Sequence, residues 1–214
     1  MQDLINITGI VLSSTPMGEY DRRVVLLTKE LGKIAAFAKG ARKPNSKLIA
    51  ATDLFAFGTF TLHPSRTSYY ITDVQISNFF EPLRVNFEGA YYGMYFLELC
   101  DYYTKENNDE VEMLKLLYQS LKALSVKSLP HKLVRYIFEI KAIAVNGEFA
   151  GMPKGEWLES THYAVQYILE TSIEKLYTFT VSNQVLEELG KIADAYRKRY
   201  IDRKINSLEM LSMF

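Results

Sequence analysis

The segment that decides the fold of the N-terminal part is Gly32-Lys33-Ile34-Ala35-Ala36-Phe37-Ala38-Lys39. Successive side chains of a β-strand point to opposite faces of the sheet. A strand here would have one apolar face, made of Ile34, Ala36 and Ala38. Its other face would carry Lys33, Ala35, Phe37 and Lys39. The apolar face suits the interior of a barrel, whereas the second face places two ammonium groups around an aromatic ring.

Four further apolar runs surround this segment, at Ile5–Val11, Val24–Thr28, Phe55–Leu62 and Ser68–Ile76. The polar stretch Ser13–Gly18 predicts a turn after the first run. His63–Thr67 predicts a hairpin loop between the last two. Five short strands within residues 1–80 are typical of a small closed barrel, for which the OB-fold is the common five-stranded form. We therefore expect an OB-fold β barrel in residues 1–80.

Beyond residue 80 the apolar period changes from two to about 3.6 residues, which predicts helices. The expected helical stripes are Leu83, Phe87, Ala90, Met94 and Leu97; Val111, Leu114, Tyr118 and Leu121; Leu133, Ile137, Ile140 and Ala144; and Val185, Leu189, Ile192 and Tyr196. Asn146-Gly147 should end the third helix, and Ser182 should cap the fourth. The sequence predicts an α+β protein of two domains, with an all-α helical bundle over residues 81–214.

The charge distribution is uneven although the 25 Lys and Arg residues balance the 25 Asp and Glu residues. A neutral molecule has no overall attraction to a polyanion, so nucleic-acid binding would depend on local charge. Residues 1–80 carry nine basic and six acidic side chains. No acidic residue interrupts positions 31–52, which contain Lys33, Lys39, Arg42, Lys43 and Lys47. This pattern fits either a solvated basic loop or a nucleic-acid contact.

The sequence offers no recognisable catalytic constellation. The three histidines, His63, His131 and His162, lie far apart without metal-ligand spacing, and no phosphate-binding glycine motif or nucleophile elbow occurs. The single cysteine, Cys100, lies in an apolar aromatic run, where a buried inert thiol is expected. We expect no enzyme activity, no cofactor and no metal.

The chain reads as a cytoplasmic, nucleoid-associated protein. One cysteine suits a reducing compartment. The first ten residues lack the pattern of a signal peptide, and no apolar window is long enough to cross a membrane.

A basic strand and loop suit single-stranded nucleic acid, because cations attract phosphates and bases stack on rings. The loop 39–47 extends the positive surface beyond Phe37, and Ser46 offers a hydroxyl to a phosphate. Phe37 could equally pack at the rim of the barrel. Of the adjacent Tyr69 and Tyr70, one ring should point inward and one outward, and periodicity does not say which. A second basic cluster, with Arg203 and Lys204, could either contact DNA or pair with nearby carboxylates.

Several of these segments resemble the N-terminal signature of the RecO family of bacterial recombination mediators. They are Asp21 with Val24–Thr28, Thr28–Lys33, and Ala38–Lys43 with Ser46-Lys47. The segment Arg203–Leu208 resembles the family's Arg-x-x-Lys-Ser-Leu ending, with the Lys and Ser displaced. Tyr136–Gly147 occupies the place of a long family helix that ends in glycine, so the resemblance runs from about residue 5 to residue 210.

The resemblance implies an N-terminal OB-fold followed by a helical domain. It implies binding of single- and double-stranded DNA, annealing of complementary strands, association with RecR, contact with single-strand-binding protein, and help in loading RecA. It carries a DNA-binding role over to Lys33, Lys39, Arg42, Lys43 and Lys47. Together with the residues proposed above, the expected DNA-binding set is Lys33, Phe37, Lys39, Arg42, Lys43, Ser46, Lys47, Arg203 and Lys204.

One departure concerns the zinc module. Many family members carry four cysteines after the long helix, whereas the corresponding place here, near residues 147–170, contains none. The ligands of a zinc site are therefore missing. The alternative to a DNA-binding mediator is a protein-interaction scaffold, whose OB-like barrel grips a partner and has little affinity for DNA.

Overall fold

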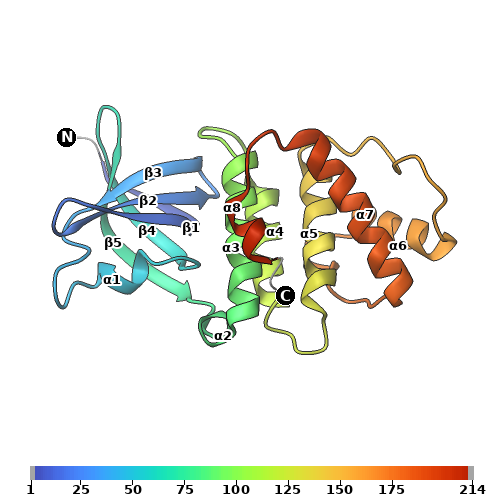
Figure 1. The fold of residues 1–214 in the computed structure, drawn as a ribbon. Coiled ribbons are helices and arrows are strands. Elements are labelled where there is room, and N and C mark those ends of the chain that lie inside the picture. Colours follow the sequence, from blue (N-terminus) through green and yellow to red (C-terminus); the bar gives the residue numbers. More distant parts are fainter. Residues whose placement is uncertain (1–2, 212–214) are drawn as a thin grey trace. The chain divides into compact units, whose positions relative to one another are not determined.

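The computed structural model describes residues 3–211, and its N-terminal part is a closed barrel of five strands (Figure 1). The strands are β1 (Ile5–Met17), β2 (Asp21–Thr28), β3 (Gly32–Ala38), β4 (Phe57–Pro64) and β5 (Tyr69–Asn78). Their order around the barrel is β1-β2-β3-β5-β4. This arrangement confirms the predicted OB-fold.

The barrel closes through a short parallel pairing between β3 and β5. Only Ala36 with Tyr69 and Phe37 with Tyr70 are paired there. The other neighbouring strands pair in antiparallel fashion over longer registers. The β3–β5 pairing is thus the shortest contact in the ring of strands.

Strand β1 is longer than the sequence indicated, because the predicted turn at Ser13–Gly18 is mostly strand. A bulge between Val11 and Ser13 shifts the register, and pairing with β2 then continues to Met17 opposite Asp21. A bulge absorbs one residue and bends the strand, which lets pairing continue past it. The turn itself is confined to residues 18–20 and begins with Gly18 at φ +59°.

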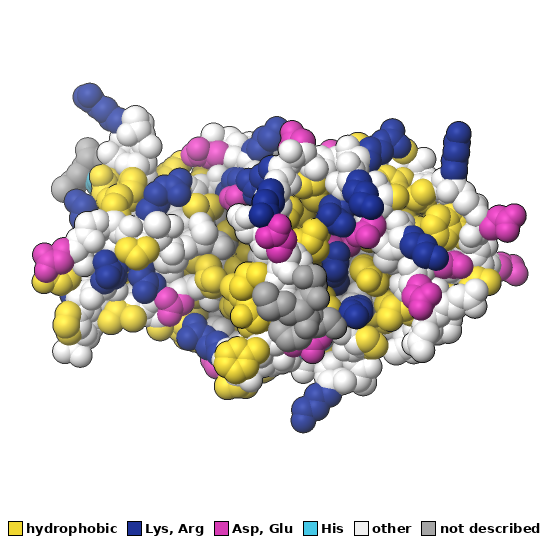
Figure 2. Space-filling model, viewed as in Figure 1, with side chains coloured by type: hydrophobic (Ala, Val, Ile, Leu, Met, Phe, Trp, Pro, Cys, Tyr) yellow, Lys and Arg dark blue, Asp and Glu magenta, His cyan; other side chains and the backbone are white. Residues whose placement is uncertain are grey.

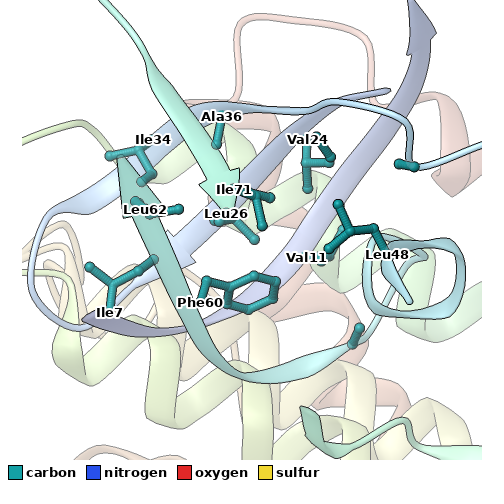
Figure 3. Close-up of a cluster of buried hydrophobic side chains, with 13 residues drawn as sticks. Ile7, Val11, Val24, Leu26, Ile34, Ala36, Leu48, Phe60, Leu62 and Ile71 are labelled. Atoms are coloured by element: carbon teal, nitrogen blue, oxygen red, sulfur yellow. The ribbon is translucent and has the colours of Figure 1, made fainter. Parts of the chain in front are cut away.

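The interior of the barrel is filled by apolar side chains from all five strands, which point toward one another in Figure 3. The largest of them is Phe60, which is fully buried. A four-residue helix, α1 (Leu48–Ala51), lies between β3 and β4 and adds Leu48 to this core. The sequence did not predict α1, because one helical turn is too short to show a period.

The described chain divides into two compact units. The first comprises the residues up to Glu81 together with Leu97–Leu114. Within it, the amide of Lys33 donates to the carbonyl of Lys105 (3.0 Å), and the amide of Asn107 donates to the carbonyl of Leu31 (3.0 Å). Gly32 has φ +66°, and a Cβ there would lie 2.3 Å from the Lys105 carbonyl oxygen. The domain boundary at residue 80 stays a prediction, since these are compact units within one folded chain.

The second unit comprises Pro82–Phe96 and the chain from Lys115 onward. The helices after the barrel are α2 (Glu81–Val85), α3 (Phe87–Tyr103), α4 (Val111–Ala123), α5 (His131–Val145), α6 (Glu159–Glu170), the 3-10 helix η1 (Ile173–Lys175), α7 (Asn183–Tyr200) and α8 (Asn206–Leu211). Within residues 3–211, none of these helices has the length and apolarity that crossing a bilayer requires.

The predicted stripes hold for α5 and α7 and fail for α3. In α4 the stripe is only half right, because Leu114 and Leu121 are buried whereas Val111 and Tyr118 are only partly buried. In α3, Phe87 is 79% exposed, whereas Tyr92, Tyr95 and Phe96 are buried. Tyr91-Tyr92 and Tyr95-Phe96 place bulky rings on adjoining positions, so the sequence allowed more than one stripe. Helices α6 and α8 were not predicted.

Helix α5 ends as Asn146-Gly147 indicated. Gly147 has φ +73°, its amide donates to Ala144 (3.0 Å), and the amide of Glu148 donates to Ile143 (3.0 Å). These two bonds form a Schellman motif, which satisfies carbonyls at the end of the helix. Ser182 likewise caps α7, where its hydroxyl oxygen accepts a bond from the Val185 amide (3.3 Å).

A buried ion pair between Arg135 and Glu139 lies in the second unit. Glu139 of α5 is 2% exposed and accepts bonds from the Tyr95 hydroxyl and from Nε of Arg135 (2.8 Å). Burial, reinforced by the charge of Glu139, raises the pKa of Tyr95 well above its ordinary value. Because an unpaired charge at this depth would be costly, we regard the Arg135–Glu139 pair as structural.

Candidate nucleic-acid interface

Strand β3 has the two faces that its sequence predicted. Ile34, Ala36 and Ala38 are almost completely buried. Lys33, Ala35 and Phe37 are partly exposed, and Lys39 follows them as an exposed residue. The outer face of the strand therefore carries an aromatic ring with a cation on either side along the chain.

The register of the barrel extends this face into a row across neighbouring strands. Phe37 of β3 is paired with Arg23 of β2 on one side and with Tyr70 of β5 on the other. Tyr70 is in turn paired with His63 of β4. Directly paired residues point to the same face of a sheet, so these side chains share the outer surface. Arg23 and Tyr70 were not among the predicted site residues.

Phe37 and Tyr70 form the aromatic centre of this row. Their ring centroids are 5.8 Å apart, at an interplanar angle of 38°. The ammonium of Lys39 lies over the Tyr70 ring, 4.7 Å from its centroid. Tyr69 packs against the barrel core instead. The question that periodicity left open is thus resolved, with Tyr70 outward and Tyr69 inward.

The loop that follows β3 is anchored while its charged groups remain exposed. The amide of Gly40 donates to Asp21 Oδ1 (2.7 Å), and Gly40 adopts φ +67°. The Arg42 amide donates to the Tyr20 carbonyl (2.8 Å), and its guanidinium donates to the Gly18 carbonyl (3.3 Å). The Lys43 ammonium lies 5.6 Å from the centroid of the Tyr20 ring. These contacts hold Arg42 and Lys43 against the β1–β2 turn.

Two of the predicted site residues are already paired with carboxylates. Lys33 binds the Asp101 carboxylate (3.1 Å) and also the Asp101 carbonyl. Lys47 binds Asp73, and this hydrogen bond lowers the pKa of the Asp73 carboxyl. By contrast, no carboxylate within residues 3–211 lies at ion-pair distance from Lys39, Arg42 or Lys43. The positive charge available for a ligand is concentrated on Lys39, Arg42, Lys43 and Arg23.

Ser46 has a local structural bond. Its hydroxyl oxygen accepts a bond from the Leu48 amide (3.3 Å) at the start of α1. The hydroxyl hydrogen can still be donated, so a phosphate contact would add to this bond rather than replace it.

The C-terminal basic cluster lies in the second unit and is partly paired. Lys204 binds Glu209 (2.8 Å) at an exposed position, and Arg197 binds Asp194 (2.6 Å). An exposed pair such as Lys204–Glu209 contributes little stability and is readily exchanged for other partners, whereas Arg197 is partly buried. Arg203 is exposed beside them. A role of Arg203 and Lys204 in DNA binding stays a prediction.

Cys100 and His131, two residue types that often act in catalysis, are held by packing and by contacts within the protein. Cys100 is fully buried, as predicted, and burial raises the pKa of its thiol far above the ordinary range. His131 contacts Glu88 (3.2 Å) and the Leu124 carbonyl (3.1 Å). Over residues 3–211, no group of three or more His, Cys, Asp and Glu side chains is arranged to hold a metal ion.

Figure 2 shows Lys and Arg side chains among hydrophobic ones over the barrel, in the same view as Figure 1. A mixed surface of this kind has the composition that single-strand binding requires, because phosphates need cations and bases need apolar or aromatic contacts. The outer surface of the barrel thus has aromatic and basic side chains at Phe37, Tyr70 and Lys39, and Arg42 and Lys43 add further positive charge in the loop after β3.

The chain is similar to known proteins over nearly its whole length. The family model described as "Recombination protein O N terminal" matches residues 1–80, and "Recombination protein O C terminal" matches residues 84–149 and 154–209. The DNA repair protein RecO of Clostridium novyi is 27% identical over 235 residues, covering 95% of this chain and 92% of the relative. RecO of Acetivibrio thermocellus is 28% identical over 238 residues, covering 95% of this chain and 94% of the relative. RecO of Bacillus pumilus is 35% identical over 147 residues, covering 67% of this chain and 56% of the relative.

The alignments also show that some residues of the relatives have no counterpart in this chain. The aligned length of 235 residues exceeds the 214 residues of this chain, so the relative contains residues without a counterpart here. The C-terminal family model is interrupted at residues 150–153, within the loop that follows α5. Both family models together span nearly the whole sequence, in the order barrel and then helices. The chain belongs to the RecO (Recombination protein O) family.

Proposed function

We propose that this protein is a DNA-binding recombination mediator in DNA repair. It binds single- and double-stranded DNA through the outer row of its barrel and promotes annealing of complementary strands. Together with RecR, it loads RecA onto DNA covered by single-strand-binding protein. The observation that carries the proposal is the group of cations without carboxylate partners among residues 3–211. Arg23 and Lys39 flank Phe37 and Tyr70, and Arg42 and Lys43 lie in the following loop against the β1–β2 turn.

Annealing by such a surface needs no proton transfer and no covalent intermediate. Two complementary strands repel each other through their phosphates, and basic side chains that neutralise part of this charge reduce the repulsion. Holding both strands on one molecule also raises their effective concentration. The protein's contribution is therefore electrostatic and positional.

The test of direct DNA binding is charge reversal in the anchored loop. Arg42→Glu/Lys43→Glu should weaken binding of a labelled oligonucleotide, measured by fluorescence anisotropy over a series of salt concentrations. The slope of log affinity against log salt should decrease by about 0.7 for each phosphate of the single strand that the variant no longer neutralises. Oligonucleotides of unrelated sequence should be affected equally, since phosphate contacts carry no base information.

A matched control is Lys29→Glu/Lys132→Glu, which makes the same change in net charge at exposed positions. Lys29 lies in the β2–β3 turn, at the opposite end of that hairpin from Arg42. The control should retain most of the affinity. Unchanged affinity and salt slope in the Arg42/Lys43 variant would contradict the proposed interface. If the unaltered protein itself shows no salt-sensitive binding, the scaffold function becomes the better explanation.

The proposed partnership is tested separately. Annealing and RecA loading should be measured with and without RecR from the same organism, on DNA covered by its single-strand-binding protein. We expect RecA loading to require both proteins. Loading that proceeds equally well without this protein would contradict the mediator function while leaving DNA binding intact.

A further inference from the structure

A small cavity of about 200 Å³ lies in the second unit, between the loop that follows α5 and the C-terminal turns of α7. Its lining residues are Ala150, Gly151, Met152, Pro153, Lys154, Ala195, Tyr196 and Arg199. Pockets for drug-sized ligands are typically about 300–1,000 Å³. This cavity therefore suits a single planar ring rather than a whole cofactor.

Tyr196, which lines the cavity, is the middle ring of a column of three aromatic rings. Phe149 stacks on Tyr196 with 4.9 Å between centroids and 17° between planes. Tyr196 stacks in turn on Tyr200, at 5.9 Å and 10°. The Arg199 guanidinium lies over the Tyr200 ring, 5.2 Å from its centroid. The Arg199 side chain, which lines the cavity, therefore lies next to the last ring of the column.

The loop is fixed to this column. The Tyr196 hydroxyl accepts a bond from the Ala150 amide (3.0 Å) and donates to the Gly151 carbonyl. Gly151 adopts φ +103°, and a Cβ there would meet no atom within 4 Å, so this part of the loop borders open space. A wall held by two hydrogen bonds and a ring stack is preorganised, which reduces the entropy cost of binding.

The charge of the cavity is positive. Lys154 and Arg199 line it, exposed Lys198 is next to Arg199 in the chain, and no acidic residue is among the lining residues. Within the described part of the chain, no carboxylate lies at ion-pair distance from Lys154 or Arg199, whereas Arg197 is held by Asp194. Figure 2 shows the gathering of Lys and Arg side chains in the region of α7.

We infer that this cavity binds one nucleotide of a single-stranded nucleic acid, as a second contact site separate from the barrel. The base stacks on the Arg199 guanidinium, which continues the ring column, because guanidinium planes and aromatic rings are the common stacking partners of unpaired bases. Lys154 binds the adjoining phosphate. The inference rests on the proposed function, since annealing requires a protein that contacts more than one strand or segment.

The only tryptophan of the chain gives a local reporter of this site. Trp157 donates from Nε1 to the carbonyl of Pro153 (2.8 Å), and Pro153 lines the cavity. Its ring also lies against Gly155, where a Cβ would be 3.4 Å from the nearest ring atoms. The barrel contains no tryptophan, so binding at the barrel alone leaves the source of the emission untouched.

The experiment titrates the full-length protein with an oligothymidylate of about 15 nucleotides and records two signals. Anisotropy of a labelled oligonucleotide reports total binding, and Trp157 emission reports the cavity. We expect saturable quenching of Trp157 that weakens as salt rises. Lys154→Glu/Arg199→Glu should weaken the quenching titration about tenfold or more, since it reverses both cations of the site. Arg42→Glu/Lys43→Glu should weaken the anisotropy titration, because barrel binding is lost, yet Trp157 should still be quenched at the oligonucleotide concentrations at which the cavity binds.

The outcomes separate this inference from the proposed function. Normal anisotropy without Trp157 quenching overturns the second site and leaves the barrel interface standing. Quenching that persists unchanged in Lys154→Glu/Arg199→Glu also overturns it. If the unaltered protein shows neither an anisotropy change nor Trp157 quenching, the proposed DNA binding itself is overturned. Quenching by an acidic peptide but not by oligothymidylate would identify a protein ligand and overturn the nucleotide assignment.

Discussion

Phe37 and Tyr70 are the side chains through which the barrel surface can contact bases rather than phosphates. Each is partly exposed, and each is flanked by a basic side chain, either Arg23 through the strand register or Lys39 over the ring. Neither residue belongs to the buried core cluster, so truncating them removes surface rather than interior packing.

Phe37→Ala and Tyr70→Ala should therefore weaken binding of single-stranded DNA with little effect on folding. Stacking of one base on one aromatic ring contributes about 1–3 kcal/mol, and each variant should lose an amount in this range. Duplex DNA, whose bases are already stacked on each other, should lose less. Anisotropy titrations with both DNA forms measure the difference, and Tyr163→Ala, which removes an exposed ring from α6, is the control. An equal loss for both DNA forms would contradict base stacking.

The sequence predicted the direction of some side chains but not the partners of others. The outward direction of Phe37 followed from alternation along one strand. The ion pair between Lys33 and Asp101 did not, because the two residues are 68 positions apart and meet only through the packing of the first unit. Arg23 entered the site through the β2–β3 register, which one sequence does not specify residue by residue.

The end of α5 depends on a backbone turn at Gly147. Gly147 is left-handed at φ +73°, and a Cβ at this position would meet no atom within 4 Å. Gly147→Ala therefore introduces backbone strain without a clash and should lower the free energy of unfolding by about 1 kcal/mol. Gly147→Asn should cost less, since asparagine tolerates this conformation. Urea titrations followed by far-UV circular dichroism measure both. Equal stability of the Ala variant and the unaltered protein would show that the Schellman turn rearranges at no cost.

Helices and strands were predicted where their apolar side chains recur with a regular period, and were missed where they do not. Helices α4, α5 and α7 carry regular apolar stripes and were found. Helix α6 was missed because its buried face is made of Thr161, Ala164, Val165 and Ile168, half of which are small or polar. Strand β1 was cut short because Ser13, Pro16 and Gly18 are residue types that favour turns, whereas the bulge lets strand pairing continue past Val11 to Met17.

The molecule as a whole buries several groups that ionise at alkaline pH. Burial is the largest cause of the raised pKa of Tyr92, to about 12, and of the raised pKa values of Tyr95 and Cys100. The ordinary values are 10.0 for tyrosine and 9.0 for cysteine. Above these values the unfolded chain loses protons that the folded chain retains. Stability should therefore decrease as pH rises from about 9 toward 12, by up to about 1.4 kcal/mol per pH unit for each group.

Urea unfolding at a series of alkaline pH values measures this dependence. Tyr92→Phe removes one of the titrating groups and should make the decrease less steep. Stability that stays constant from neutral pH to about pH 11 would mean that these groups ionise equally in the folded and unfolded chains.

The short pairing between β3 and β5 has a consequence for the barrel once DNA is bound. Phe37 and Tyr70 occupy one of the two residue pairs that close the ring of strands. A strand of nucleic acid that contacts both rings would hold β3 and β5 together at the shortest pairing of the barrel. The free energy needed to separate β3 from β5 would then increase as more of the protein binds DNA. The amides of β3 and β5 would exchange more slowly with solvent deuterium in the complex.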